Sequence, residues 1–132
     1  MEDYLLIKFN FSAQREWKYF AVLDGHIDEH VAQFCSQELA TFLEDKIGHL
    51  ITATTVDIAA LRKAVEDAYV EFDEVIRRKG LNSGSTCTSV LIGPQFFLFA
   101  NVGDSRSFLI SDGNLRFETG LFYNLTIFYP VV

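Results

Sequence analysis

The chain has 132 residues, of which 49% are hydrophobic and 14% aromatic, and it carries a net charge of −7. This length and apolar content predict one globular domain with its own core and leave no room for two. The negative charge repels phosphate backbones and anionic lipids, so neither nucleic acid nor a membrane is an expected partner. The acidic start and the short apolar runs fit neither a signal peptide nor a membrane span, which predicts a cytoplasmic or nuclear protein.

Strand formers open the chain. Residues 4–11 and 17–23 are rich in them, and the polar stretch between has the length of a hairpin loop, so the two segments are expected to pair antiparallel. Apolar residues then recur at helical spacing from 28 to about 50 and from about 56 to 78. These two segments predict amphipathic helices, the second with Asp57 as its cap.

Further strands are expected at 86–92, 96–102 and 105–111. The sequence SDGN at 111–114 signals a hairpin turn, across which residues 115–119 pair back. Strands and helices do not alternate along the chain, which argues against a parallel sheet. The order predicts an α+β fold of layered antiparallel sheets.

Carboxylates are predicted to gather at one end of the first hairpin. Pairing of the two strands places Tyr4 opposite Asp24, with Glu2 and Asp3 just beyond. Such carboxylates repel one another unless a cation or a shared proton compensates. With the backbone carbonyl of Gly25 beside them, they suit Mg²⁺ or Mn²⁺, whereas zinc favours His or Cys.

The later hairpin brings a hydroxyl and another carboxylate together. With Ile92 opposite Phe96, Thr86 lies across from Val102 and therefore near Asp104. The two side chains are then placed to orient a water molecule at a metal. This pairing rests on an assumed register, which a slip of one residue inverts.

Each of these motifs also has a plain structural explanation. Asp-Gly is among the commonest turn dipeptides, so the DGH at 24–26 can be a turn that starts a helix. The SGST at 83–86 is ordinary loop sequence, and Gly103 with Asp104 can form a tight turn. Cys35 and Cys87 lack metal-site spacing and are predicted to be reduced core thiols. Spacing alone makes a metal site possible without establishing one.

Four blocks, in order, resemble the metal-dependent serine/threonine protein phosphatases of type 2C. They are MED at the start, FAVLDGH followed by VAQFCSQEL, then SGST, and then FANVGDSRSFLISDGNLRF. The resemblance runs from residue 1 to about 119 and makes 1–132 a single partial domain with a divergent tail at 120–132. It implies a β-sandwich of antiparallel sheets flanked by helices, truncated at the C-terminus, with a pair of Mg²⁺ or Mn²⁺ ions at one end.

The resemblance also implies metal ligands and an activity. Glu2 and Asp3 fall in the acidic metal-binding motif, with Glu2 a ligand of one ion. Asp24 bridges both ions, and the Gly25 carbonyl ligates one of them. The implied reaction is hydrolysis of phosphoserine and phosphothreonine in phosphoprotein substrates by a metal-activated water.

Three further residues receive roles in the same way. His26 is similar to the general acid that protonates the leaving oxygen. Thr86 and Asp104 look like the pair that positions the metal-bound water. Neither cysteine has the surroundings of a thiol phosphatase nucleophile.

The chain departs from the family pattern in three places. Ile27 stands where a glycine usually follows DGH, and the arginine that precedes the acidic motif in the family is absent. After RFET the sequence continues as GLFYNLTIFYPVV, which matches nothing in the family and is typical of an exposed, aggregation-prone strand. Because the aspartates of the second metal site are missing, the alternative is a catalytically inactive fragment that acts as a binding or interfering module. The sequence leaves the oligomeric state open.

Overall fold

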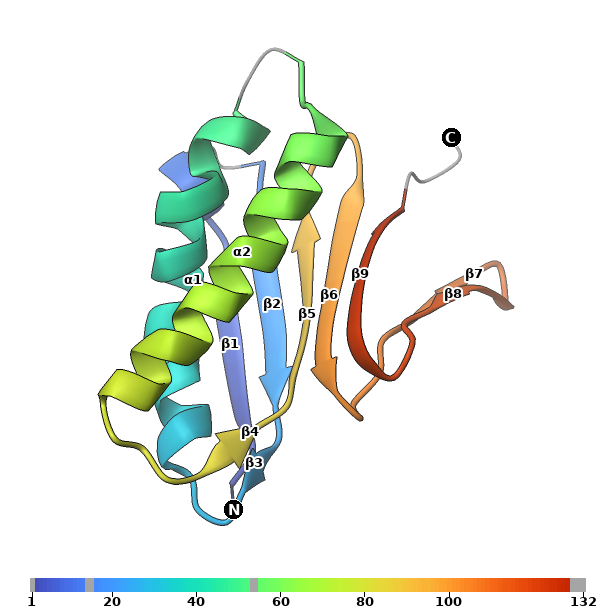
Figure 1. Ribbon diagram of the computed structural model, residues 1–132. Helices are drawn as coiled ribbons and strands as arrows, with labels where there is room; N and C mark the ends of the chain where they lie inside the picture. The colour runs from blue at the N-terminus through green and yellow to red at the C-terminus, as the bar shows by residue number, and fades with distance from the viewer. Residues whose placement is uncertain (1, 14–15, 53–54, 129–132) are drawn as a thin grey trace.

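The computed structural model describes residues 2–13, 16–52 and 55–128. Its main element is a five-stranded antiparallel sheet in the order β1-β2-β5-β6-β9, with two helices on one face (Figure 1). The strands of this sheet are β1 (Tyr4–Lys8), β2 (Lys18–Leu23), β5 (Cys87–Ile92), β6 (Phe97–Gly103) and β9 (Phe122–Phe128). The predicted α+β class with antiparallel sheets is confirmed.

Two small sheets complete the structure. One pairs β3 (Gly25–His26) with β4 (Gly84–Ser85), and the other pairs β7 (Phe108–Ser111) with β8 (Asn114–Glu118). The β7–β8 hairpin extends away from the main sheet (Figure 1). Its turn residues, Asp112 and Gly113, both have positive φ angles of 53° and 73°, as a tight hairpin turn requires. The predicted SDGN turn is therefore confirmed.

The helices α1 (His30–Ile51) and α2 (Ile58–Arg78) follow the predicted apolar pattern. The predicted cap of α2 is confirmed, because the Asp57 carboxylate accepts a hydrogen bond from the Ala60 N–H at 3.0 Å. The helices meet through aromatic rings, with Phe34 stacked on Phe72 at 5.6 Å between ring centroids. Together they cover one face of the sheet.

The first hairpin has a different register from the predicted one, which set Tyr4 opposite Asp24. The Phe11 N–H does donate to the Trp17 carbonyl, at 2.9 Å. Between that bond and the pair Lys8–Tyr19, however, the first strand has two residues where the second strand has only one. This extra residue shifts the ladder, so Tyr4 lies opposite Leu23 rather than Asp24.

The second hairpin is also displaced by one residue. The Gly93 N–H donates to the Phe96 carbonyl at 3.1 Å, which closes a four-residue turn and makes Ile92 pair with Phe97. Gly93 is needed there because a Cβ at this position would lie 2.1 Å from a ring carbon of Trp17. The ladder then pairs Cys87, not Thr86, with Val102.

The tail beyond residue 120 forms a strand, as predicted, but it is not fully exposed. β9 pairs with β6 along its whole length, from Gly103 opposite Phe122 to Phe97 opposite Phe128. The Leu125 side chain lies opposite Ala100 and is buried in the core. Residues 129–132 of the tail lie outside the described residues.

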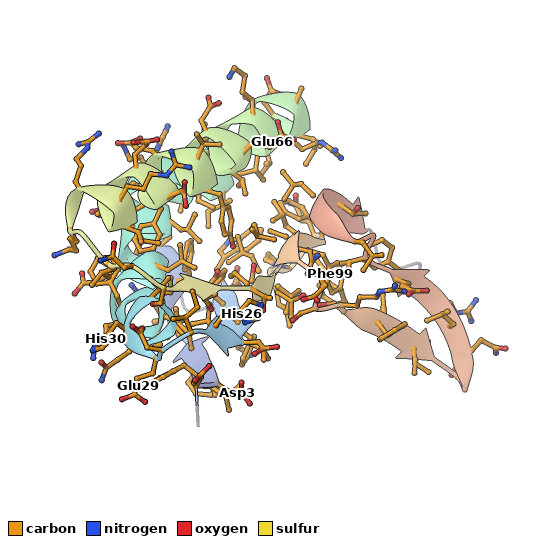
Figure 2. The ribbon with its side chains drawn as sticks, turned by 60° about the horizontal axis from the view of Figure 1, so that its bottom comes forward. Asp3, His26, Glu29, His30, Glu66 and Phe99 are labelled. Carbon is orange, nitrogen blue, oxygen red and sulfur yellow. The ribbon has the colours of Figure 1, made fainter. Side chains whose placement is uncertain are left out.

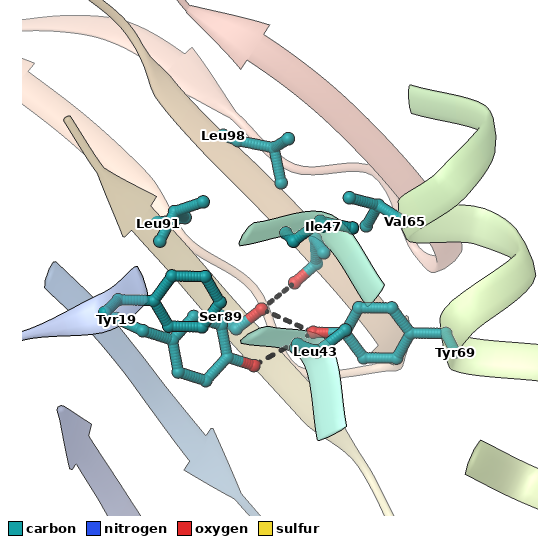
Figure 3. Close-up of a pocket in the computed structure, with 10 residues that line it drawn as sticks. Tyr19, Leu43, Ile47, Val65, Tyr69, Ser89, Leu91 and Leu98 are labelled. Carbon is teal, nitrogen blue, oxygen red and sulfur yellow. Dashed lines mark hydrogen bonds between the residues drawn. The ribbon is translucent and has the colours of Figure 1, made fainter. Parts of the chain in front are cut away.

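A hydrogen-bonded polar group lies inside the helix-covered core (Figure 3). The Tyr69 hydroxyl is 3.0 Å from the Tyr19 hydroxyl and 2.8 Å from the Ser89 hydroxyl. Ser89 also donates to the Ala100 carbonyl at 3.3 Å. Burial raises the pKa of both tyrosines well above the usual value, so both hydroxyls stay neutral and hold β2, β5 and α2 together.

The face of the sheet opposite the helices is apolar as well. Along β1 and β2 it exposes large side chains: Leu5 at 69%, Ile7 at 55% and Val22 at 46%. A sheet with one wet face normally alternates apolar and polar residues. Both faces of this sheet therefore carry apolar side chains that suit packing against another layer, although the helices cover only one face.

Candidate functional site

The motifs DGH and SGST pair with each other at one end of the sheet. β2 ends at Leu23, and β3 then pairs antiparallel with β4. Gly25 lies opposite Ser85, and His26 lies opposite Gly84. The two motifs are thus not separate turns, because each supplies one strand of the same short ladder.

Asp24 is held by its backbone. Its carbonyl accepts a hydrogen bond from the Thr86 N–H at 2.9 Å, and its own N–H donates to Thr86 Oγ1 at 3.2 Å. Thr86 is 3% exposed, whereas the Asp24 side chain is 51% exposed. The peptide of Asp24 is therefore fixed from inside the protein while its carboxylate remains open to a ligand.

The N-terminal segment runs directly beside DGH. The Gly25 N–H donates to the Glu2 carbonyl at 3.2 Å. A Cβ at Gly25 would lie 2.6 Å from that carbonyl oxygen, so only glycine permits this approach. Extending the β1–β2 register by one pair places Asp3 opposite Asp24. Figure 2 shows Asp3 and His26 at this same end of the molecule.

The turn after β6 closes the site from the other side. Gly103 has a φ of +100°, and a Cβ there would lie 2.8 Å from the Thr86 methyl group. The Ser105 hydroxyl is 2.9 Å from Thr86 Oγ1. Asp104 thus lies between two residues that both approach Thr86. Ser105 was not among the predicted site residues, and its signal in the sequence is its place directly after Asp104.

His26 is exposed and lies under the influence of several carboxylates. Its Nδ1 is 3.9 Å from an Asp24 oxygen. The pKa of His26 is raised above its ordinary value, first by a hydrogen bond with the Gly25 backbone, while partial desolvation opposes the shift. Three negative charges raise this pKa further: Asp24, Asp104 and Glu2. One imidazole therefore experiences all three carboxylates, and its protonated form is favoured.

The donor chemistry of this end suits a hard divalent cation. The accessible groups are carboxylates and backbone carbonyls, which Mg²⁺ and Mn²⁺ prefer. Within residues 2–13, 16–52 and 55–128, no group of three His, Cys, Asp or Glu side chains is arranged to hold a metal ion. The ligand roles of Glu2, Asp3, Asp24 and Gly25 remain predictions, with donors of the right kind but without a complete cage.

Ile27 directly follows the motif and has an unusual backbone. Its φ is 76°, in the left-handed region that glycine favours, and its side chain is 84% exposed. A β-branched residue is strained in this conformation. The turn thus keeps the shape that a glycine would adopt, at a cost in backbone strain.

The cysteines take no part in this site. Both are free and buried, as the prediction of core thiols requires. Burial raises the pKa of Cys35 to about 12 and that of Cys87 to about 11. Neither thiol is therefore a nucleophile near neutral pH.

Comparison with known proteins assigns the family. The family described as protein phosphatase 2C matches residues 1–121. The chain belongs to the protein phosphatase 2C family. Among the helices of the described residues, none has the length and apolar character to cross a membrane.

Individual relatives agree with this assignment. Human protein phosphatase 1B is 33% identical over 115 residues, which cover 79% of this chain and 24% of that protein. Human protein phosphatase 1A is 32% identical over 114 residues, which cover 82% of this chain and 30% of that protein. The matched part of this chain thus corresponds to less than a third of each relative's length.

Solved structures show the same fold. A C. elegans sex determining protein superposes with a TM-score of 0.64 at 20% identity, covering 87% of this chain and 29% of that one. The serine-threonine phosphatase 2C from Toxoplasma gondii gives a TM-score of 0.60 at 12% identity, covering 99% of this chain and 45% of that one. These likenesses support the architecture described above.

Proposed function

We propose that this chain contributes the N-terminal part of a metal-dependent protein phosphatase that hydrolyses phosphoserine and phosphothreonine in proteins. The observation that carries the proposal is the pairing of DGH with SGST. That pairing fixes the Asp24 peptide through two bonds to Thr86 and leaves the Asp24 carboxylate accessible. Membership of the protein phosphatase 2C family supports the reaction class.

In this proposal Mg²⁺ or Mn²⁺ is held by Asp24 and the Gly25 carbonyl, with Glu2 and Asp3 from the adjacent segment. Such ions supply a nucleophile at neutral pH and neutralise charge on the phosphate when they are bound. Thr86 keeps Asp24 in place, since it bonds both the N–H and the carbonyl of that residue. The backbone contact between Gly25 and Glu2 holds the two acidic segments together.

Proton transfer is assigned to His26, and orientation of the attacking water is assigned to Thr86 and Asp104. His26 donates a proton to the leaving serine or threonine oxygen, and its raised pKa favours the protonated form that this role requires. Thr86 and Asp104 orient the attacking water. Both lie next to Ser105, whose hydroxyl fixes the Thr86 hydroxyl.

A second function applies to the 132 residues alone. Two observations motivate it: no group of three His, Cys, Asp or Glu side chains among the described residues is arranged to hold a metal ion, and the match spans 24% and 30% of the two human relatives. We propose, as the alternative, that the isolated chain is catalytically inactive and serves as a binding or interfering module that occupies partners of the full enzyme.

The two functions are separated by measuring Mn²⁺ binding and phosphopeptide hydrolysis on the same samples. The variants are Asp24→Ala and, as a matched control, Asp67→Ala on the exposed face of α2. Mn²⁺-dependent turnover that is lost in Asp24→Ala and kept in Asp67→Ala supports the enzyme. Mn²⁺ binding that depends on Asp24, with no turnover in any sample, supports the inactive module. Equal Mn²⁺ affinity in all three proteins contradicts the proposed metal site.

A further inference from the structure

The segment 104–107 joins β6 to β7 and is tied to β5 by side-chain hydroxyl groups (Figure 1). The Ser105 hydroxyl is 2.9 Å from the Thr86 hydroxyl, and the Ser107 hydroxyl is 3.1 Å from the Thr88 hydroxyl. The charged residues that alternate with the two serines are exposed, as expected for an extended segment with one side toward the sheet. The hydroxyl groups of this segment therefore face β5, and its charges face outward.

The Thr86 side chain is held by both residues that flank Asp104. A Cβ on Gly103 would lie 2.8 Å from the Thr86 methyl group, so this methyl packs directly against the glycine. Ser105 contacts the hydroxyl of the same side chain. A threonine side chain has few rotamers, and these two contacts favour the one that directs its hydroxyl at the Asp24 N–H, which is 3.2 Å away.

The Ser105 hydroxyl thus connects the positions of two carboxylates. Ser105 directly follows Asp104, while Thr86 fixes the peptide of Asp24 through its hydroxyl and its N–H. Thr86 is 3% exposed, so water has almost no access to its hydroxyl. Without Ser105 this hydroxyl loses a partner that solvent cannot replace, which favours another rotamer because an unmade bond at a buried polar group is costly. The Asp24 peptide then loses one of its two anchors.

We propose that Ser105 is a positioning residue, which sets the spacing of the Asp24 and Asp104 carboxylates by locking the Thr86 side chain between them. This inference rests on the proposed function, in which Asp24 holds Mg²⁺ or Mn²⁺ and Asp104 orients water. Ser105 acts through Thr86 and takes no direct part in the chemistry. Groups that orient a metal ligand in this way affect metal affinity although they do not touch the ion.

Mn²⁺ binding by the 132-residue chain, measured by titration calorimetry, tests the proposal. Ser105→Ala is expected to weaken Mn²⁺ binding by about tenfold or more, which is the usual effect of losing a group that orients a metal ligand. Ser105→Thr keeps the hydroxyl and is expected to restore the wild-type affinity. Ser107→Ala is the matched control, because it removes the same kind of contact at Thr88 and leaves Thr86 alone. The control is expected to bind Mn²⁺ as the wild type does.

A second measurement needs no metal. Amide hydrogen exchange of the metal-free protein, followed by NMR, reports on the Asp24 N–H itself. This amide is expected to exchange about fivefold faster in Ser105→Ala, which corresponds to the loss of roughly one net hydrogen bond, and at the wild-type rate in Ser107→Ala. The amides of β2 are expected to keep their wild-type rates in both variants. A loss of protection spread evenly over β2 overturns the proposal, because it indicates a general loosening of the sheet.

The two measurements separate failure of this proposal from failure of the proposed function. A Mn²⁺ affinity that Asp24→Ala leaves unchanged contradicts the metal site, and exchange of the Asp24 N–H then decides the role of Ser105 alone. Wild-type exchange of that amide in Ser105→Ala overturns the proposal. So does a Mn²⁺ affinity that falls in Asp24→Ala and not in Ser105→Ala. Equal effects of Ser105→Ala and Ser107→Ala overturn it as well, because they indicate a structural role that both serines share.

Discussion

The helix-covered core differs in composition from the motif end of the sheet, which is the end where DGH and SGST pair. The core is apolar, and the motif end is charged. In the core, buried side chains such as Leu43, Val65 and Leu91 pack between the sheet and the helices, and the polar atoms of the Tyr19–Tyr69–Ser89 group bond one another. At the motif end the carboxylates are accessible, and Ile27 has a strained backbone. The comparison teaches that stability comes from the core and that it supports an end which is charged and strained, as functional sites often are.

The largest expected effect tests the core side of this comparison. Leu91→Ala removes a side chain that is 2% exposed and leaves a cavity against α1 and α2, so it lowers the free energy of unfolding by about 2–5 kcal/mol. The matched control is Ile7→Ala on the uncovered face of the same sheet, where the side chain is 55% exposed. This control changes the free energy of unfolding by less than about 1 kcal/mol. Urea denaturation checks both, and equal losses contradict the assignment of stability to the helix-covered face.

The next effect has the opposite sign and tests the strain at the motif end. Ile27→Gly relieves a left-handed residue, which costs roughly 1–2 kcal/mol for non-glycine side chains, and part of the gain is offset by the greater freedom of glycine in the unfolded chain. We expect a net gain of about 1 kcal/mol in the free energy of unfolding. Ile27→Ala keeps the strain and serves as the control. Thermal melting in which the Gly variant is no more stable than the Ala variant shows that the turn is not strained.

The smallest effect concerns the charge at the start of α1. The Ser83 hydroxyl, together with the backbone and side chain of His30, lowers the pKa of Asp28 from its ordinary 3.8 to about 2. The charged carboxylate therefore stabilises the fold above pH 3.8, and this contribution is lost as the pH falls from there toward 2. Asp28→Asn is expected to be less stable at neutral pH and to lose less stability on acidification over that window.

This acid dependence is measured by urea unfolding at a series of pH values. Ser83→Ala, which removes the first partner of the Asp28 carboxylate, should show part of the same change. If the wild-type chain and Asp28→Asn lose stability in parallel between pH 4 and pH 2, the carboxylate has no special role at this helix start.

Sequence reasoning located the strands and helices well because each depends on a local pattern. The helical spacing at 28–50 and 56–78 predicted α1 and α2 to within two residues at each end. Register was harder to predict. One extra residue before Phe11 and a four-residue turn at Gly93 shifted both hairpins by one position, and neither feature leaves a periodic signal.

The candidate site was also predicted only in part, because its residues were identified and the contacts between them were not. Composition and motif drew attention to Asp24, Thr86 and Asp104 one by one. The contact of DGH with SGST was not predicted, because it continues the register of β2 with β5, two strands that lie far apart in the sequence. Ser105 was missed for the related reason that its role lies in one hydroxyl contact to Thr86. The positive φ of Ile27 could not be foreseen from the residue itself, although the resemblance had marked that position as one where glycine is usual.

The bond between the Asp24 N–H and the Thr86 hydroxyl joins residues 62 positions apart in the chain. Everything between them, including α1 and α2, is a loop whose ends must be brought together before this bond can form. Closing such a loop carries an entropic cost, which the pairing of β2 with β5 and the packing of the helices offset together. A substitution that loosens the helices or β5 from β2 therefore acts on the distant carboxylate, because it lets this loop reopen.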